Sequence, residues 1–223
     1  TLRYGILPKL DIITRCASIA NKGSETVILT KAASLCLDIP MGKWEWVHFH
    51  GRHTMERVAE RSELIHGIQE SSSKRGTSSH HQNPSVLLCS HDCTEIAGSC
   101  IGVLLAYSGS FKTQIELDQQ EQVRLVMGIN PELFRWELKP SEVFDTPEAI
   151  MSYSGSGTEK LSHNFHKVIR EHVCRGKYKL AERPVLINNW EATYFDFNEE
   201  KILKIAEQAA SLGVDMLVLD DGW

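Results

Sequence analysis

The chain has 223 residues, a formal net charge of −5 and 42% hydrophobic residues. This composition is ordinary for a folded protein and argues against a nucleic-acid partner, which usually requires a basic surface. No apolar run reaches the roughly 18 residues that a membrane-spanning helix needs, so we expect no membrane partner. The sequence begins at Thr1 without an initiator methionine, and we therefore expect an internal fragment of a longer protein.

The six cysteines are irregularly spaced and too sparse for a disulfide scaffold. We expect free thiols in a reducing compartment, which favours the cytoplasm. Secretion stays open, because we expect a segment before Thr1 that could carry a signal peptide. Cys89, His91 and Cys93 suggest zinc, but no second Cys/His pair follows at a standard distance, so we predict no metal site.

Residues 1–179 alternate short apolar runs with turn clusters, which is typical of an all-β sandwich. Residues 145–153 suit the start of a helix or a strand equally well. Amphipathic spacing over residues 161–174 predicts a helix, which we expect to bridge the sandwich and the next domain. The predicted strands are 11–20, 27–37, 43–49, 63–69, 85–89, 100–107, 112–118 and 123–127.

The last forty residues have the pattern strand, loop, helix, strand. Residues 185–187 and 216–219 are short apolar runs, each suited to a strand buried on both faces. Asp196 and Glu199 have the spacing of a helix N-cap and its capping-box partner, and Gly213 suits a helix C-cap. Two strands about 30 residues apart predict one right-handed βαβ unit. Because such a unit cannot bury itself, it predicts the opening of a larger parallel α/β domain.

Polar and aromatic side chains follow both of these strands. Trp190 comes after the first, and Asp220 and Asp221 come after the second. The carboxyl ends of parallel strands are where ligands bind in such architectures. Carboxylates make short hydrogen bonds to sugar hydroxyls, and an indole ring can pack on the apolar face of a sugar. From the residues alone, a structural role is equally open for the two aspartates, with Asp221 as a helix cap and Asp220 in an ion pair with a lysine or arginine. For Trp190 alone, packing in the core is the more common role.

Several motifs resemble those of the α-galactosidases of glycoside hydrolase family 36. Residues 183–197 read RPVLINNWEATYFDF and residues 219–223 read LDDGW, as at the start of the catalytic barrel of that family. Similar motifs occur earlier, with Ser110 replacing a usual asparagine and Ser141 a usual glycine. They are RGTSSH with Asn83-Pro84 at residues 75–84, YSGSF at 107–111, GINPELF at 128–134 and EVFDTPE at 142–148.

The resemblance covers nearly the whole chain and implies two domains. Residues 1–179 would form an N-terminal β-supersandwich, with the bridging helix at 161–174. Residues 180–223 would begin a (β/α)8 TIM barrel that is truncated after its second strand. The family assembles through its sandwich domain, commonly as a tetramer, which implies a homo-oligomeric parent.

The resemblance also implies an activity for the full-length parent. The parent would hydrolyse terminal α-galactose from sugars such as melibiose and raffinose, with retention, by double displacement and without a cofactor. Trp190, Asp220 and Asp221 would bind the terminal galactose.

In the family both catalytic aspartates come from later barrel strands. Adjacent Asp220 and Asp221 cannot flank one glycosidic bond, because successive side chains of a strand point in different directions. We therefore predict that this chain alone is inactive and, with strand edges exposed, poorly soluble. Two alternatives stay open: a non-catalytic carbohydrate-binding or oligomerisation module, and a galactosyltransferase of the raffinose-synthase type.

Overall fold

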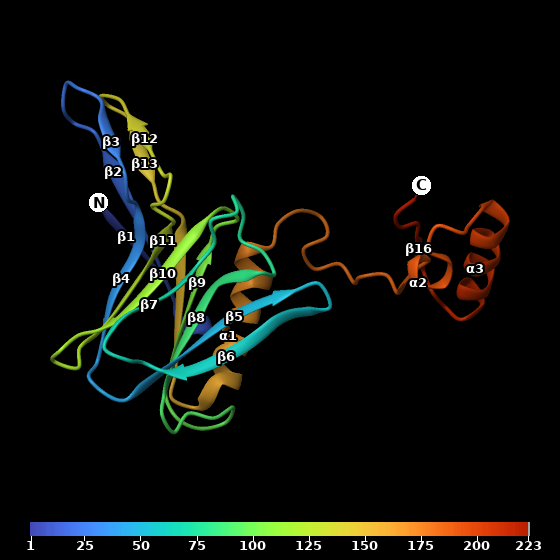
Figure 1. Ribbon diagram of the computed structural model, residues 1–223, viewed down its shortest axis with the longest axis horizontal. Helices are drawn as coiled ribbons and strands as arrows, with labels where there is room; N and C mark the ends of the chain where they lie inside the picture. The colour runs from blue at the N-terminus through green and yellow to red at the C-terminus, as the bar shows by residue number, and fades with distance from the viewer. Residues whose placement is uncertain (223) are drawn as a thin grey trace. The chain divides into compact units, whose positions relative to one another are not determined.

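The computed structural model describes residues 1–222 and divides the chain into two compact units (Figure 1). The division falls between Glu171 and His172, whereas the sequence placed the domain boundary at residue 179. The first unit is almost entirely β-structure, and the second contains two parallel strands and two helices. Within the described residues, no helix is both long and apolar enough to cross a membrane.

An eight-stranded antiparallel sheet forms the larger layer of the first unit. Seven strands follow the order β1-β2-β14-β9-β8-β5-β6, and β13 pairs with β2 beside them. The edges of this path are therefore β1 and β6. The strands are β1 (Leu2–Leu7), β2 (Ile12–Ala20), β5 (Trp44–Arg52), β6 (Met55–Glu63), β8 (Gln82–Ser90), β9 (Cys100–Ala106), β13 (Val143–Asp145) and β14 (Glu148–Ser154).

A four-stranded sheet of order β4-β11-β10-β7 packs on one face of the larger sheet. Val86, Val103 and Phe111 are fully buried between the two layers, where alternating apolar residues of both sheets meet. A separate two-stranded ribbon pairs β3 (Val27–Leu29) with β12 (Trp136–Leu138). The strands of the smaller sheet are β4 (Ala33–Ile39), β7 (Gly67–Ser72), β10 (Phe111–Leu117) and β11 (Val123–Ile129).

One helix, α1 (Gly157–Val168), packs on the larger sheet through a second apolar cluster. Leu161, Phe165 and Val168 provide its buried face, at the spacing expected of an amphipathic helix. A π-helical turn, Ile169–Val173, continues the chain into the second unit. The predicted helix is thus present but begins four residues earlier, and α1 belongs to the first unit.

Most predicted strands are present, with three differences. The predicted strand 27–37 is two strands, β3 and β4, which belong to different sheets. The predicted strand 63–69 is wrong, because β6 ends at Glu63 and β7 begins at Gly67. The sequence did not predict β1, β6, β12 or β13. The ambiguous residues 145–153 fall mainly in β14, so the strand alternative is confirmed.

The second unit pairs β15 (Leu186–Asn188) with β16 (Met216–Val218) in parallel register. Between them lie α2 (Trp190–Thr193) and α3 (Glu199–Ser211), so the predicted strand–helix–strand order is confirmed. Gly213 has a positive φ of 82° after α3, as predicted for the C-cap region. The predicted N-cap is wrong: Asn198 accepts the hydrogen bond of the Lys201 N–H at 3.0 Å, and Asp196 instead pairs with the Lys201 ammonium.

Candidate functional site

The parallel register of β15 and β16 brings the two polar segments of the second unit together. Asn188 lies opposite Val218, so the residues that follow each strand emerge at the same edge of the pair. The backbone N–H of Asn189 donates to the carbonyl of Val218 at 3.4 Å, which extends this pairing by one residue. Side chains 32 positions apart in the sequence can therefore contact one another.

The Asn188 side chain joins the two segments directly. Its Nδ2 donates a hydrogen bond to Oδ2 of Asp220 at 2.5 Å. Its Oδ1 accepts the backbone N–H of Trp190 at 2.7 Å, which fixes the start of α2. One amide group therefore orients a carboxylate and positions the residue that carries the indole ring.

Asn189 provides the buried support of the site, with no exposed surface. Its Oδ1 accepts the backbone N–H of Asp220 at 2.8 Å, and its Nδ2 donates to Oγ1 of Thr193 at 3.0 Å. The Asn189 side chain thus forms hydrogen bonds both with the backbone at the end of β16 and with the Thr193 hydroxyl of α2. Asn189 therefore links the end of β16 to α2.

The two carboxylates make local hydrogen bonds to the backbone. Asp220 Oδ1 accepts the N–H of Asp221 at 2.8 Å, and Asp221 Oδ1 accepts the N–H of Gly222 at 2.7 Å. Among residues 1–222, neither aspartate forms an ion pair with a lysine or arginine. Asp221 is exposed, and Asp220 is half-buried. Trp223, which completes the DDGW motif, lies outside the described residues.

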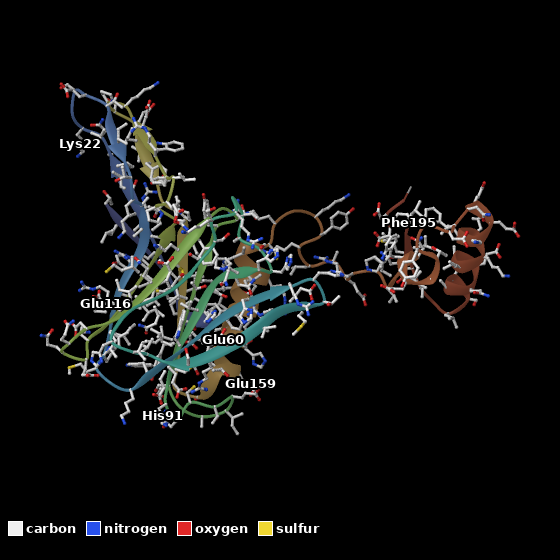
Figure 2. The ribbon with its side chains drawn as sticks, in the orientation of Figure 1. Lys22, Glu60, His91, Glu116, Glu159 and Phe195 are labelled. Atoms are coloured by element: carbon white, nitrogen blue, oxygen red, sulfur yellow. The ribbon has the colours of Figure 1, made fainter. Side chains whose placement is uncertain are left out.

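Aromatic rings surround the start of α2. The ring of Trp190 packs edge-on against Tyr194 and Phe195, with centroids 5.4 and 4.9 Å apart. Phe195, which Figure 2 labels, also lies against Gly222. A Cβ added to Gly222 would approach Cδ1 of Phe195 to 2.7 Å, and the φ of this glycine is +87°. Phe195 was not among the predicted site residues, although its place in the aromatic run 190–197 is a usable signal.

This arrangement can bind a hydroxylated ligand but cannot by itself hydrolyse a glycoside. Asp220 and Asp221 both have lone pairs left for hydroxyl donors, and Trp190 offers a half-buried ring nearby. Retaining hydrolysis needs two carboxyl groups on opposite sides of the scissile bond, about 5–5.5 Å apart. Two consecutive carboxylates at the end of one strand do not provide that geometry.

The cysteine and histidine residues considered for zinc do not come together. Cys89 and Cys93 are buried with Cys100 in the core beneath α1, whereas Nδ1 of His91 contacts Oε1 of Glu45 at 2.8 Å. Burial, with the neighbouring Cys93, raises the pKa of the Cys89 and Cys100 thiols to about 12. These thiols are thus protonated at neutral pH.

One other group of potential ligands occurs among the described residues. Donor atoms of Glu45, Glu63 and His91 lie within 4.8 Å of one another. The Glu45 carboxylate already accepts hydrogen bonds from Arg61 and His91, and these two partners lower its pKa against the opposing effect of desolvation. The Arg61 cation thus already balances the charge of the Glu45 carboxylate.

Comparison with known families covers almost the whole chain. The family described as "Glycosyl hydrolase family 36 N-terminal domain" matches residues 1–139, and the family described as "Melibiase" matches residues 143–223. A bifunctional alpha-galactosidase/sucrose kinase, AgaSK, of Mediterraneibacter gnavus is 50% identical over all of this chain. Alpha-galactosidase Mel36A of Lactobacillus acidophilus is 46% identical, also over all of it. The chain spans only 24% and 30% of these two relatives.

Solved structures agree in fold as well as in sequence. The crystal structure of alpha-galactosidase AgaA from Geobacillus stearothermophilus is 47% identical and has a TM-score of 0.95. All of this chain is covered, and 31% of AgaA. A variant of AgaA has been solved in complex with raffinose, at 46% identity and the same TM-score. The motifs, the β-rich first unit and these matches agree, and the chain belongs to glycoside hydrolase family 36.

Proposed function

We propose that this chain is part of an α-galactosidase. The enzyme would remove terminal, non-reducing α-D-galactose from sugars such as melibiose and raffinose. Membership of family 36 supports this, since the relatives at 46–50% identity are named as alpha-galactosidases. Because the chain spans about a quarter to a third of their length, the activity would be that of a longer parent protein.

The second unit would be the opening of the catalytic barrel. Support comes from β15, α3 and β16, which have the order and parallel pairing of the repeating unit of a (β/α)8 barrel. Residues 1–179 would then be the complementary β-supersandwich domain and 180–223 the barrel start. The exposed apolar residues of the second unit, such as Leu203 and Leu212, suit burial by further barrel elements.

The observation that carries the proposal is the link between Asn188 and Asp220 at the carboxyl ends of β15 and β16. Active sites of such barrels lie at this edge of the strands. Asp220 and Asp221 would accept hydrogen bonds from galactose hydroxyls, and Trp190 would pack against the sugar ring. Asn188 and Asn189 would hold Asp220 in position.

The chemistry would be a double displacement with retention, carried out by two carboxyl groups from later strands. The first would attack the anomeric carbon while the second protonates the leaving oxygen; water would then release galactose. The residues of this chain would bind and orient the substrate. No cofactor is part of the proposal, because carboxyl groups are enough for this reaction.

Steady-state kinetics of the full-length parent on a nitrophenyl α-galactoside tests the proposal. Replacing Asp220 or Asp221 by asparagine keeps the shape but removes charge-assisted hydrogen bonds, each worth about 1.5–3 kcal/mol. We expect kcat/KM to fall by about 10²-fold or more in each variant. Asp196→Asn is the matched control: this carboxylate belongs to the same unit, is 92% exposed and lies outside the site. It should leave kcat/KM unchanged.

Two results would contradict the proposal. One is a parent protein without α-galactosidase activity, which would favour a binding module. The other is galactose transfer to a sugar acceptor with no net hydrolysis, which would favour the raffinose-synthase type. Proton NMR of the first product should show α-galactose if the configuration is retained. Light scattering of the same sample tests the proposed tetramer.

A further inference from the structure

A cavity of about 590 Å³ lies between α1 and the larger sheet, within the first unit. This volume is within the range of about 300–1,000 Å³ that is typical of small-molecule sites. Phe49, Leu87 and Leu104 of the sheet and Leu161 and Phe165 of α1 supply apolar surface. The cavity is therefore built from two elements that already pack together, and its shape is fixed by the core beneath it.

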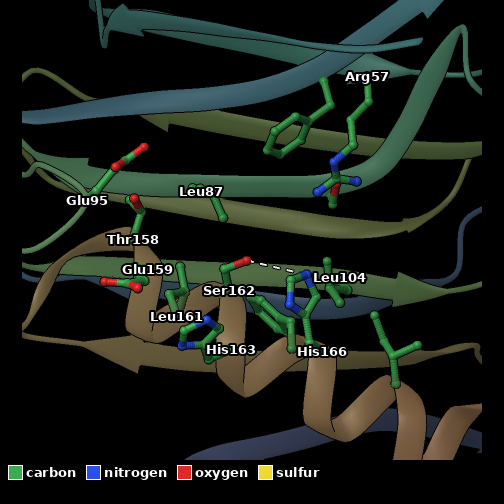
Figure 3. A pocket seen from close by; sticks show the side chains of 14 residues that line it. Arg57, Leu87, Glu95, Leu104, Thr158, Glu159, Leu161, Ser162, His163 and His166 are labelled. Atoms are coloured by element: carbon green, nitrogen blue, oxygen red, sulfur yellow. Dashed lines mark hydrogen bonds between the residues drawn. The ribbon is translucent and has the colours of Figure 1, made fainter.

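Charged side chains of opposite sign line different ends of this cavity. Figure 3 shows Glu95, Thr158 and Glu159 gathered at one end, well separated from Arg57. His166 of α1 lies at the Arg57 end, where its Nε2 is 3.5 Å from the hydroxyl of Ser162. The cavity can thus offer hydrogen-bond donors at one end and carboxylate acceptors at the other.

A β-bulge directs Arg57 into the cavity. The register of β5 and β6 shifts between His50 and Arg52, and Arg57 on the facing strand has a φ of +55°. Gly51 makes this close approach possible, because an added Cβ would lie 2.4 Å from the carbonyl oxygen of Met55. A non-glycine residue with a left-handed backbone conformation costs conformational energy, and such residues are concentrated at functional sites. A β-bulge changes the direction in which a side chain points, and bulges are common next to active sites.

The Arg57 guanidinium lies over the Phe49 ring, 4.4 Å from its centroid. Within the described part of the chain it forms no ion pair. Arg57 is exposed, so the cation lies at the open wall of the cavity, stacked on an aromatic ring and without an acidic partner among the described residues. A planar guanidinium in this state suits a carboxylate or phosphate ligand.

A second group in the cavity lacks a partner. Ser85 is 4% exposed, and its buried Oγ has no hydrogen-bond partner among the described residues. Buried hydroxyls are normally satisfied, and an exception needs an explanation. The Oγ itself has almost no accessible surface, so the Ser85 side chain would rotate towards the cavity for a ligand oxygen to supply the missing hydrogen bond.

We propose that this cavity binds a small anionic sugar, namely a monosaccharide that carries one phosphate or carboxylate group. The anionic group would pair with Arg57, and Ser85 would hydrogen-bond the ligand. Sugar hydroxyls would donate to Glu95 and Glu159, with the apolar face of the ring against the cavity floor. The cavity is lined by residues of the first unit alone, none of which belongs to the proposed galactose site, so the ligand we propose is an effector and not the substrate.

Titration calorimetry of the full-length parent tests this, with glucose 6-phosphate and glucuronate as probes for the two anionic groups. Neutral glucose and inorganic phosphate are the controls. We expect at least one anionic sugar to bind with a dissociation constant below about 1 mM, and both controls to bind at least tenfold more weakly. Binding of glucose as tight as that of both probes, or no binding of either probe, would overturn the proposal.

Variants identify the site. Arg57→Gln should weaken binding of the preferred probe about 10- to 100-fold, and Arg57→Lys should weaken it less. Arg52→Gln, at the tip of the same hairpin, is the matched control and should leave binding unchanged. Equal losses in Arg57→Gln and Arg52→Gln would overturn the assignment.

Ser85→Ala separates binding from folding. Because the hydroxyl has no partner among residues 1–222, its removal should leave the unfolding temperature unchanged or raise it, while probe affinity falls several-fold. A lower unfolding temperature with unaltered affinity would show a purely structural hydroxyl and contradict the proposal. Hydrolysis of the α-galactoside should be intact in the Arg57 and Ser85 variants, so failure here is distinguishable from failure of the proposed activity.

Discussion

Nδ2 of Asn188 donates a hydrogen bond to Oδ2 of Asp220 across 2.5 Å and 32 positions of sequence. This contact joins the ends of two parallel strands that a helix separates along the chain. The neighbouring Asn189 adds a second hydrogen bond between the same segments, because its Oδ1 accepts the backbone N–H of Asp220. The orientation of Asp220 thus depends on two amide side chains of the other strand.

Asn189→Ala should loosen the end of β16. The substitution removes the acceptor of the Asp220 N–H and the donor to Thr193, at a cost of about 1–3 kcal/mol. Hydrogen–deuterium exchange of the full-length protein should show faster exchange in the peptide covering residues 216–222. Gln208→Ala, on the exposed face of α3, should leave that exchange unchanged. Equal exchange rates in the unmodified protein, Asn189→Ala and Gln208→Ala would refute the supporting role of Asn189.

Gly102→Ala should separate α1 from the larger sheet. A Cβ at this position of β9 would approach Cε2 of Phe165 to 2.4 Å, and overpacking of this kind costs about 1–3 kcal/mol. Thermal unfolding should show a lower midpoint for the variant. Gly155→Ala is the control, because its Cβ meets only the Tyr153 hydroxyl at 3.3 Å. Adding Phe165→Leu to Gly102→Ala should recover part of the loss; no recovery would mean that the clash lies elsewhere.

The cysteines should differ sharply in reactivity. Cys36 and Cys174 are exposed, whereas Cys89, Cys93 and Cys100 are buried. Burial raises the pKa of Cys89 and Cys100 to about 12, so the reactive thiolate is scarce at neutral pH. Alkylation with iodoacetamide followed by peptide mass spectrometry should label Cys36 and Cys174 in the native protein. The three buried cysteines should react only after unfolding, and rapid native labelling of Cys89 would contradict their burial.

The same two thiols predict a loss of stability at alkaline pH. Their folded-state pKa lies above the ordinary value of 9.0, so the folded state keeps its thiol protons where the unfolded state releases them. The associated stability is fully present below about pH 9 and is lost as the pH rises towards about 12. A Cys89→Ala, Cys100→Ala double variant should show a shallower decline of the unfolding midpoint over this range, and an identical slope would argue against the shift.

His48 should titrate below its ordinary pKa of 6.5. Burial of the ring lowers the pKa, and this effect exceeds the opposing attraction of Glu60. A depressed folded-state pKa means that the neutral ring stabilises the fold above pH 6.5, and that this contribution is lost as the pH falls through the lower value. Histidine C2-proton exchange measured by mass spectrometry reports the pKa of each histidine. A value at or above 6.5 for His48 would show that Glu60 prevails.

The sequence predicted elements whose apolar pattern is local. The sequence predicted β8, β9, β10 and α1. In these elements the apolar residues recur with the period of a strand or a helix, so the pattern can be recognised within one short segment. β6 escaped prediction because it is an edge strand with charged residues on both faces, so it has no apolar alternation. The break between β3 and β4 depends on pairing with two different partners, β12 and β11, which are distant in sequence.

The positions of the candidate site residues at the strand ends were predictable from the sequence, but the hydrogen bonds that connect them were not. Trp190, Asp220 and Asp221 follow strand ends, which the sequence showed. The hydrogen bond between Asn188 and Asp220 depends on the register of two strands, which no local pattern specifies. The position of Arg57 likewise depends on a bulge that forms only when β5 and β6 pair. Tertiary pairing decided these features, so they could be learned only from the structure.

The larger sheet ends in two edges of opposite character. β6 presents mostly charged residues, whereas β1 exposes Leu2, Tyr4 and Ile6, each more than half accessible. A charged edge discourages a further strand, and an apolar edge accepts one. Of the two edges of this sheet, β1 should therefore be the one from which aggregation of the isolated chain grows. A lysine in place of Tyr4 or Ile6 would improve the yield of soluble material more than any change on β6.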